Sequence, residues 1–253
     1  MKHKFIYIFL LIILAAAVFI YFDNQKERVA IIGAMENEIE EIQSHLSFVK
    51  YSQKNDYQII TGQIGKNKII LSKSGVGKVS SATTTQYIID RYHPTYIVNI
   101  GIAGSISPDL KVGDTIIAEK MVQHDFDVTA FGCPKGYISN GIEPNKPTIF
   151  YSDKKLINKF KKGNCVKQGT IASGDIFVTD IRLKNSIKRE FGADAIDMES
   201  AAIAHTAKRN NIPVIVVRTI SDGVVDKTNV YNKNKLDIAK KPAQVVIDVL
   251  KAD

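Results

Sequence analysis

Three carboxylic acids in this sequence stand shortly after runs that are typical of β-strands. They are Glu38, Glu199 and Asp222, and long stretches of chain separate them. Acids gathered in a dry pocket can give or take protons at a reacting bond. Their residue type and their positions after strands therefore indicate general acid–base chemistry.

Each acid also has a purely structural explanation. Glu38 and Glu199 lie at the start of predicted helices, where the helix dipole favours negative charge. Asp222 can cap the turn after its strand. Taken singly, the structural explanation is the stronger one for each residue. The coincidence of three acids at strand ends favours a shared acid–base site instead.

The elements that would position these acids alternate along the chain after Arg28. Short apolar runs predict strands, and apolar residues at helical spacing predict helices. The predicted strands are Val29–Ile32, Tyr57–Thr61, Lys68–Ser72, Tyr96–Ile100, Thr115–Ala118, Val122–Val128, Thr170–Ser173, Asp194–Ile196 and Val214–Ile220. The predicted helices are Glu36–Leu46, Lys78–Tyr92, Ile181–Phe191, Ser200–Asn210 and Ala239–Leu250, and Gly132–Pro147 is expected to be a loop.

This alternation predicts a fold of the α/β class. Residues 29–253 are expected to form a single domain with a central mixed, mostly parallel β-sheet flanked by helices. Ligands of such sheets bind outside the carboxyl ends of the strands. All three acids follow strands in the way that such a site requires.

Composition and motifs argue against several other functions. A formal net charge of +8 over 253 residues favours anionic surroundings. No run of basic and aromatic residues forms a nucleic-acid motif, so no nucleic-acid partner is expected. The segment Ser74–Lys78 (SGVGK) lacks the spacing of a Walker phosphate loop, and five scattered histidines indicate no zinc site. We therefore expect no cofactor and no metal.

The first 28 residues differ from the rest of the chain. An uncharged run from Phe5 to Phe22 reaches the low end of the length that spans a bilayer, about 17–25 residues. It exceeds the apolar core of a cleaved signal peptide, about 7–15 residues. We expect residues 1–28 to be a signal anchor with a transmembrane helix, and the remaining domain to lie outside the cytoplasm at the membrane. Secretion after signal-peptide cleavage is the alternative. Cys133 and Cys165 then form either a disulfide or two free thiols.

Eight short motifs also occur together in one order. They are IIGAMENE (31–38), SGVGK (74–78), NIGIAG (99–104), KVGD (111–114), HDFDVTAFG (124–132), SGDIF (173–177), DMESAAIA (197–204) and VRTISD (217–222). Together they resemble the 5′-methylthioadenosine/S-adenosylhomocysteine nucleosidases of the purine nucleoside phosphorylase superfamily, over about residues 29–250. Those enzymes hydrolyse the N-glycosidic bond of adenine nucleosides, and the resemblance implies the same reaction here.

The resemblance assigns a role to each matching residue. Asp222 matches the general acid that protonates N7 of adenine, and Glu38 matches the acid that activates the attacking water. Glu199 and Met198 match the residues that hold the ribose. The remaining matches are Phe177 and Val178 around the base, Ala34, Met35 and Gly104 as pocket lining, Arg218 and Ser221 as supports of Glu38 and Asp222, and Phe131 as a residue that reaches the partner subunit's pocket in a homodimer.

The chemistry of bond cleavage agrees with these roles. Adenine leaves poorly as an anion, so Asp222 must carry a proton, which a dry pocket favours. Glu38 and Glu199 must be charged, because positive charge develops on the ribose as the bond breaks.

Two alternatives to hydrolysis remain. A phosphate-dependent phosphorylase needs cations around its phosphate, but Ile32–Ile42 contains no Lys or Arg and includes Glu38. An exported polyanion-binding protein could reuse the fold, although it has no need of both acids. Asn37, Ile102 and Asp197 depart from the family's pattern. They leave the 5′ substituent of the nucleoside open, since related nucleosidases accept aminodeoxyfutalosine, adenosine or 5′-deoxyadenosine.

Overall fold

The computed structural model describes Leu14 and residues 26–139, 145–162, 164–224 and 237–252. The expected transmembrane helix within residues 1–28 lies almost entirely outside these described residues. Within the described part of the chain, no helix combines the length and the apolar character that crossing a bilayer requires.

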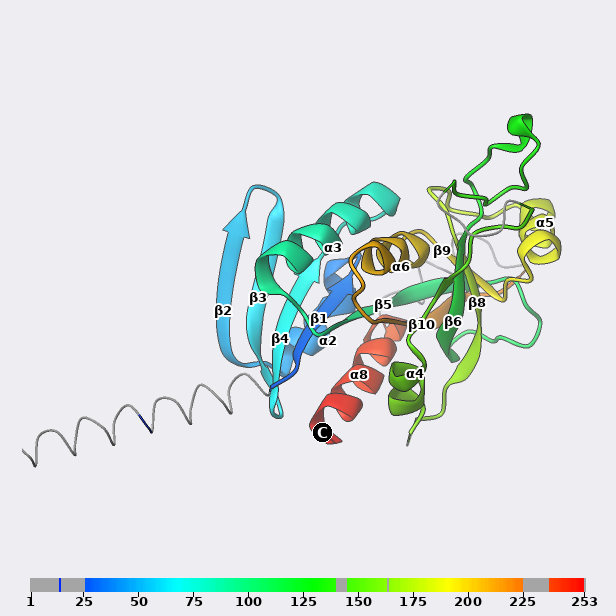
Figure 1. Cartoon of the computed structure of the whole chain (residues 1–253). Coiled ribbons are helices and arrows are strands. Elements are labelled where there is room, and N and C mark those ends of the chain that lie inside the picture. Colours follow the sequence, from blue (N-terminus) through cyan, green and yellow to red (C-terminus); the bar gives the residue numbers. More distant parts are fainter. Residues whose placement is uncertain (1–13, 15–25, 140–144, 163, 225–236, 253) are drawn as a thin grey trace, which may run out of the picture.

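Ten strands form one sheet (Figure 1). The order is β10-β6-β8-β9-β5-β1-β4-β3-β2, with β7 beside β6. Because β10 also pairs with β5, the strands β5, β10, β6, β8 and β9 form a closed ring, and β1, β4, β3 and β2 extend from it as an open wing. The strands are β1 (Arg28–Gly33), β2 (Ser47–Lys54), β3 (Tyr57–Ile64), β4 (Asn67–Lys73), β5 (Tyr96–Ser105), β6 (Thr115–Gln123), β7 (Phe150–Tyr151), β8 (Lys167–Ser173), β9 (Ala195–Asp197) and β10 (Val214–Asp222).

The sheet is mixed, as expected, but antiparallel pairs are as frequent in it as parallel ones. β1 runs parallel to β4 and β5, β5 runs parallel to β10, and β8 runs parallel to β6 and β9. The wing β2–β3–β4 and the pairs β10–β6, β5–β9 and β6–β7 are antiparallel. A two-residue turn at Gly65 and Lys66 reverses the chain directly between β3 and β4, whereas a parallel pair needs a long crossover.

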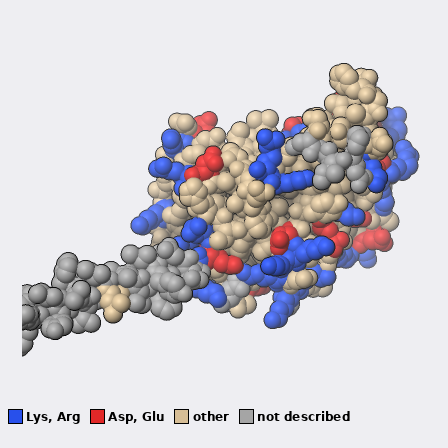
Figure 2. All heavy atoms as spheres, in the orientation of Figure 1, with Lys and Arg blue, Asp and Glu red and all other residues tan. Residues whose placement is uncertain are grey.

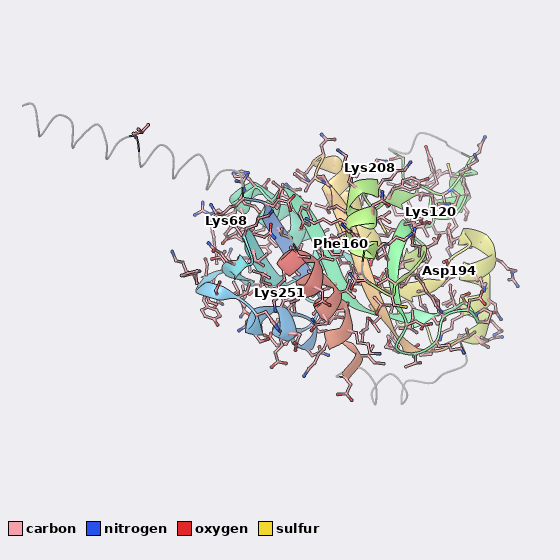
Figure 3. The ribbon with its side chains drawn as sticks, turned by 90° about the horizontal axis from the view of Figure 1, so that it is seen from below. Lys68, Lys120, Phe160, Asp194, Lys208 and Lys251 are labelled. Atoms are coloured by element: carbon pink, nitrogen blue, oxygen red, sulfur yellow. The ribbon has the colours of Figure 1, made fainter. Side chains whose placement is uncertain are left out.

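Helices cover both faces of the sheet (Figure 1). Ala30 and Ile32 of β1 pack in the cluster that contains residues of α3 and α6, and Val29 and Ile31 pack with α2, α4 and α8. This alternation follows from the two-residue period of a strand. In the view from below (Figure 3), Phe160 of α4 lies in the interior, and it is fully buried. The helices are α2 (Glu36–Ser44), α3 (Lys78–Tyr92), α4 (Lys154–Lys161), α5 (Ile181–Phe191), α6 (Ser200–Arg209), α8 (Lys240–Ala252) and the short 3₁₀ helix η1 (Thr129–Phe131).

The structure corrects the expected strand Val122–Val128. β6 ends at Gln123, and the next residues form turns. The side chains of Asp125 and Asp127 accept hydrogen bonds from the backbone N–H groups of Asp175 and Thr129, so local polar contacts replace the sheet ladder here. Cys133 and Cys165 are free thiols.

Candidate active site

Glu38 lies in the first turn of α2 and folds back toward the end of β1. Its Oε2 accepts hydrogen bonds from the backbone N–H groups of Ala34 at 2.7 Å and Met35 at 3.0 Å. Its Oε1 accepts a third, at 3.1 Å, from the backbone N–H of Ile102 in β5. The residue is buried. These bonds join the β1–α2 turn to β5 and hold the carboxylate in one orientation.

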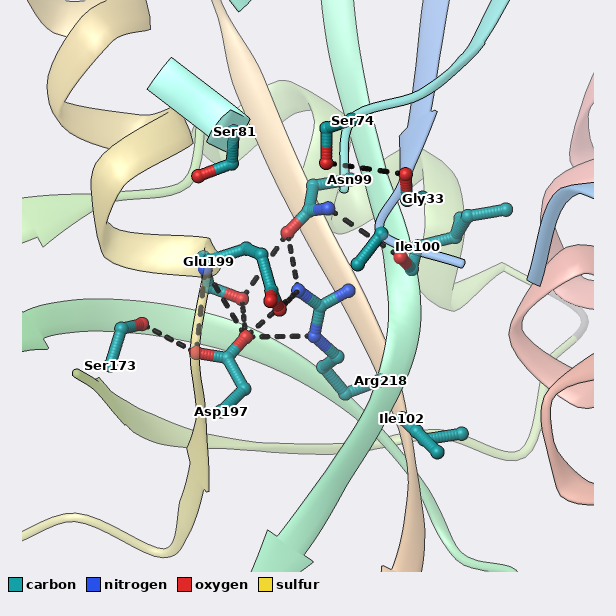
Figure 4. Close-up of polar contacts among 12 residues, drawn as sticks. Gly33, Ser74, Ser81, Asn99, Ile100, Ile102, Ser173, Asp197, Glu199 and Arg218 are labelled. Carbon is teal, nitrogen blue, oxygen red and sulfur yellow. Dashed lines mark hydrogen bonds and ion pairs between the residues drawn. The ribbon is translucent and has the colours of Figure 1, made fainter. Parts of the chain in front are cut away.

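Arg218 of β10 is a buried cation surrounded by acids (Figure 4). Its Nη2 lies 2.8 Å from Asp197 Oδ2 and 3.7 Å from Glu199 Oε2, and it donates a hydrogen bond to Asn99 Oδ1 at 2.8 Å. Ser173 donates to the other oxygen of Asp197 at 2.5 Å. The guanidinium therefore holds the acids of β9 and the start of α6 against the centre of the sheet.

Arg218 and Glu38 both pack against the backbone of Gly101. Among the described residues, Arg218 Nη1 has no hydrogen-bond partner. A Cβ atom on Gly101 would lie 2.5 Å from this nitrogen and 2.7 Å from Glu38 Oε1. Both groups thus lie directly against Gly101, and a larger side chain at position 101 would overlap them.

Asp222 ends β10 beside a local irregularity in its pairing with β5. Its Oδ1 accepts a hydrogen bond from Ser221 Oγ at 2.8 Å. Its Oδ2 lies 3.0 Å from the point that a Cβ on Gly104 would occupy, so a larger residue there would press on the carboxylate. Lys184 Nζ of α5 lies 3.6 Å from the same oxygen.

A cleft of about 580 Å³, part of it open to solvent, brings these regions together. The cleft is lined by Ala34, Met35, Val76, Ile102, Ala103, Gly104, Ile176, Phe177, Val178, Ile196, Asp197, Met198, Glu199, Ser221 and Asp222.

Nine of the twelve residues expected at the site line this cleft: Ala34, Met35, Gly104, Phe177, Val178, Met198, Glu199, Ser221 and Asp222. Glu38 and Arg218 lie behind the lining and are buried. Phe131 lies in η1, is 84% exposed, and is not among the lining residues of this chain. Arg218 was expected to support Glu38, but its close partners are Asp197 and Asn99.

Sequence reasoning missed some contributors. Asn99 interrupts the apolar run of β5, and this buried amide in a core strand is a signal that could have marked it. Val76 and Ile176 line the cleft next to expected residues, but an isolated apolar side chain carries no chemical signal. Lys184 also lies against the site, and its helix reads as an ordinary surface helix.

Burial changes the acid–base properties of the cluster. Burial raises the pKa of Glu38, while Arg218 and the three backbone N–H donors oppose that rise. Burial, with the neighbouring Asp197 carboxylate, raises the pKa of Glu199 to about 7. Burial alone would lower the pKa of Arg218, but Asp197, Glu199 and Glu38 raise it above its ordinary value. Arg218 is therefore charged, and Glu199 changes charge near neutral pH.

Replacing Glu199 by Gln should stabilise the protein increasingly as the pH rises. The native pKa of about 7 lies above the ordinary value of 4.5, so the native state binds more protons between these pH values. Stability present at low pH is lost as the pH rises through 7, and Gln avoids this loss. The advantage of Glu199→Gln in unfolding free energy should grow by on the order of 2 kcal/mol between pH 5 and pH 8.

Urea unfolding of both proteins at the two pH values measures this difference. Glu40→Gln, a substitution of an exposed residue of α2 away from the cleft, serves as the control and should show little change. An advantage of Glu199→Gln that is equal at pH 5 and pH 8 would contradict the raised pKa of Glu199.

Comparison with known proteins places this geometry in a family. The model of the phosphorylase superfamily matches residues 28–251. A 5′-methylthioadenosine/S-adenosylhomocysteine nucleosidase of Buchnera aphidicola is 37% identical over 217 residues, which are 83% of this chain and 91% of that protein. One from Staphylococcus haemolyticus is 34% identical over 228 residues, 88% of this chain and 98% of that protein.

Solved structures give the same result. A nucleosidase of this name from Neisseria meningitidis, in complex with methylthio-immucillin-A, superposes with a TM-score of 0.84 at 33% identity and covers 90% of this chain and 100% of that one. A futalosine hydrolase from Helicobacter pylori superposes with a TM-score of 0.85 at 27% identity, covering 91% and 100%. The chain therefore belongs to the phosphorylase superfamily and, within it, to the family of 5′-methylthioadenosine/S-adenosylhomocysteine nucleosidases.

Proposed function

We propose that this protein hydrolyses the N-glycosidic bond of 5′-methylthioadenosine, S-adenosylhomocysteine or a closely similar adenine nucleoside, and releases adenine. The observation that carries the proposal is the arrangement of three acids around one cleft. Asp222 and Glu199 line it, and Glu38, buried behind the lining, accepts a hydrogen bond from the backbone N–H of the lining residue Ile102.

The reaction divides the acids by role. Asp222 gives its proton to N7 of adenine as the N9–C1′ bond breaks, and the electron pair of that bond moves into the purine ring. Water adds to C1′ and loses a proton to Glu38. The products are neutral adenine and a ribose with a new hydroxyl group, and the protons return through solvent from Glu38 to Asp222.

The position of Glu38 supports it as the group that directs water. Its carboxylate oxygens accept hydrogen bonds from the backbone N–H groups of Ala34, Met35 and Ile102, and all three of these residues line the cleft. The raised pKa of Glu38 makes its carboxylate a better base than an exposed glutamate, while its backbone donors keep it oriented. Arg218 supports Glu38 electrostatically, because its positive charge favours the charged form of the Glu38 carboxylate.

The lining residues divide between the sugar and the base. Glu199 accepts from the ribose hydroxyls, with Met198 below the sugar, and its own Oε1 is oriented by the backbone N–H of Gly77 at 3.0 Å. Phe177 stacks on adenine and the backbone of Val178 reads the edge of the base. Ser221 holds Asp222 toward N7 through its 2.8 Å hydrogen bond.

Water, rather than phosphate, suits this site. No Lys or Arg is among the described lining residues of the cleft, and Arg218 behind it is already surrounded by acids. Adenine release from methylthioadenosine should therefore proceed in phosphate-free buffer. Strict dependence of release on added phosphate would identify a phosphorylase instead, and no release from any adenine nucleoside would refute the proposal.

The 5′ substituent is best resolved by a substrate panel. The apolar group of Met35, Ile102 and Ile238 near the cleft favours an uncharged alkylthio group over a polar one. Methylthioadenosine, adenosylhomocysteine, adenosine and an aminodeoxyfutalosine, compared by adenine release, would rank these choices.

A basic surface also permits binding to polyanions, but the charges are mixed. On the described part of the face in Figure 2, aspartates and glutamates lie among the lysines and arginines. Salt-sensitive retention on a polyanion column that persists in an inactive Asp222→Asn protein would support this second role.

A homodimer belongs to the same proposal. The exposed apolar side chains Val76, Val79, Ile176 and Phe131 lie on or beyond the lining elements of the cleft, and a second copy would cover such a surface. Phe131 would then enter the partner's cleft next to the alkylthio group. Chemical cross-linking of the full chain should give a species of twice its 28.1 kDa mass, and Phe131→Ser should weaken it.

The N-terminal segment, residues 1–28, would anchor the domain formed by residues 29–253 to the membrane, with the domain on the outer side. The basis is the uncharged run Phe5–Phe22. A C-terminal reporter that works only outside the cytoplasm should be active in the membrane fraction. An active cytoplasmic reporter would reverse the orientation, and activity in the medium would indicate cleavage.

A further inference from the structure

Lys184 of α5 is buried although its neighbours on the helix are largely exposed. Its side chain is 1% exposed. It lies one turn before Ile187, on the buried face of the helix, where an apolar residue is the usual choice. Lysines are almost never fully buried without a partner, because removing the ammonium group from water is costly.

The ammonium group of Lys184 reaches the end of β10. It donates a hydrogen bond to the carbonyl oxygen of Gly223 at 2.9 Å. It also lies 3.6 Å from Oδ2 of Asp222, whose other oxygen accepts the hydrogen bond of Ser221. The two oxygens of Asp222 are thus held by different groups, a hydroxyl on one side and a cation on the other.

This position matters for the proton transfer in the proposed reaction, on which the inference rests. When the O–H bond of Asp222 breaks and the N7–H bond forms, the electron pair stays on the Asp222 carboxylate. Negative charge then develops on a largely buried carboxylate, which water solvates poorly. A cation already oriented toward Oδ2 stabilises that charge with no reorganisation.

We propose that Lys184 is a positioning residue for adenine release, which holds Asp222 in place and stabilises the carboxylate left after the proton has passed to the base. Lys184 transfers no proton in this step and does not line the cleft. Its effect is therefore confined to substrates whose leaving group must be protonated.

Two substrates separate this role from a structural one. Methylthioadenosine needs a proton at N7, whereas the matching 5′-methylthio nitrophenyl riboside releases nitrophenolate, which leaves as an anion. In Lys184→Met, which fills the buried position with an apolar chain of similar length, kcat for methylthioadenosine should fall about 10- to 100-fold. The KM of Lys184→Met for methylthioadenosine and its kcat for the nitrophenyl riboside should both stay within about threefold of the wild-type values.

The control is Lys188→Met, one turn further along α5. Lys188 Nζ lies 3.4 Å from Ser107 Oγ, and the substitution should leave both substrates unaffected. Only folded molecules cleave either substrate. Partial misfolding therefore lowers both apparent kcat values by the same factor and leaves their ratio unchanged. Lys184→Arg, which retains a cation, should return the ratio toward that of the wild type.

A double substitution tests whether Lys184 acts through Asp222. Adding Lys184→Met to Asp222→Asn should cause no further loss, because the charge that it stabilises no longer forms. An unchanged ratio in Lys184→Met, or equal losses on both substrates, would overturn the inference. Failure of the wild-type protein to cleave either substrate would instead count against the proposed function itself.

Discussion

Replacing Asp222 by Asn should lower kcat for adenine release by about 10²- to 10⁴-fold, the usual contribution of general acid catalysis. Asn has the size of Asp and can still accept the Ser221 hydrogen bond, but it has no acidic proton to give to N7. The base then has to leave with its charge unneutralised. KM should change much less, because the lining of the cleft is otherwise intact.

Steady-state adenine release measures this effect, and the exposed Asp248→Asn in α8 is the control for removing one negative charge. The nitrophenyl riboside adds a sharper criterion, since Asp222→Asn should retain most of its activity on a substrate that needs no acid. If Asp222→Asn loses both activities equally, Asp222 does not act as the acid for the leaving group.

Replacing Glu38 by Gln should lower kcat by about 10²- to 10³-fold on every substrate, including the nitrophenyl riboside. Water must lose a proton whichever group leaves, and an amide is too weak a base to accept it. One end of the amide would also present N–H groups to the backbone donors of Ala34, Met35 or Ile102, which now bind the carboxylate. Some loss of stability should therefore accompany the loss of activity.

Adenine binding separates these two effects, because Glu38 does not line the cleft and product binding should persist in a folded Glu38→Gln protein. Glu36→Gln is the matched control. It lies two residues earlier in α2, exposed and paired with Lys73 at 2.9 Å, and its replacement should leave kcat unchanged. A Glu38→Gln protein with more than about a tenth of wild-type kcat would assign water activation to another group.

The two substitutions together distinguish activation of the leaving group from activation of the water. Asp222→Asn affects the leaving group, Glu38→Gln affects the nucleophile, and the nitrophenyl riboside distinguishes them. Lys184→Met should resemble a weaker Asp222→Asn in this comparison. The three proteins thus test whether Glu38 acts on the water and Asp222 acts on the leaving base during cleavage of the same N-glycosidic bond.

Local patterns determined much of this protein. The apolar run of β1, the helical spacing of Ile39 and Ile42 in α2, and the acids at or just after the ends of β1, β9 and β10 are properties of short segments, because side-chain direction repeats along each element. The convergence of Asp222 and Glu199 on one cleft did not follow from strand direction, because β10 runs parallel to β5 whereas β9 runs antiparallel to it. Both strands instead meet β5 at Gly104, which pairs with Asp222 and with Ile196.

Other local patterns were insufficient. β2 is exposed along its whole length, so no alternation of apolar residues marked it. The run Val122–Val128 has strand-forming residues, but its aspartates bind nearby backbone groups instead of extending β6. Hydrogen bonds from these side chains, formed in place of backbone hydrogen bonds between strands, therefore set the end of β6.

Contacts between distant segments were decided by the tertiary structure alone. β10 pairs with both β5 and β6, which closes the ring and brings Arg218 to Asp197 and Asn99. Lys184 reads as one more lysine on a surface helix until α5 packs against the end of β10 and turns it toward Asp222. Residue type and spacing determine which chemistry is possible. The distance between two charged groups depends instead on how separate elements pack against each other, and a periodic pattern within one element does not specify that packing.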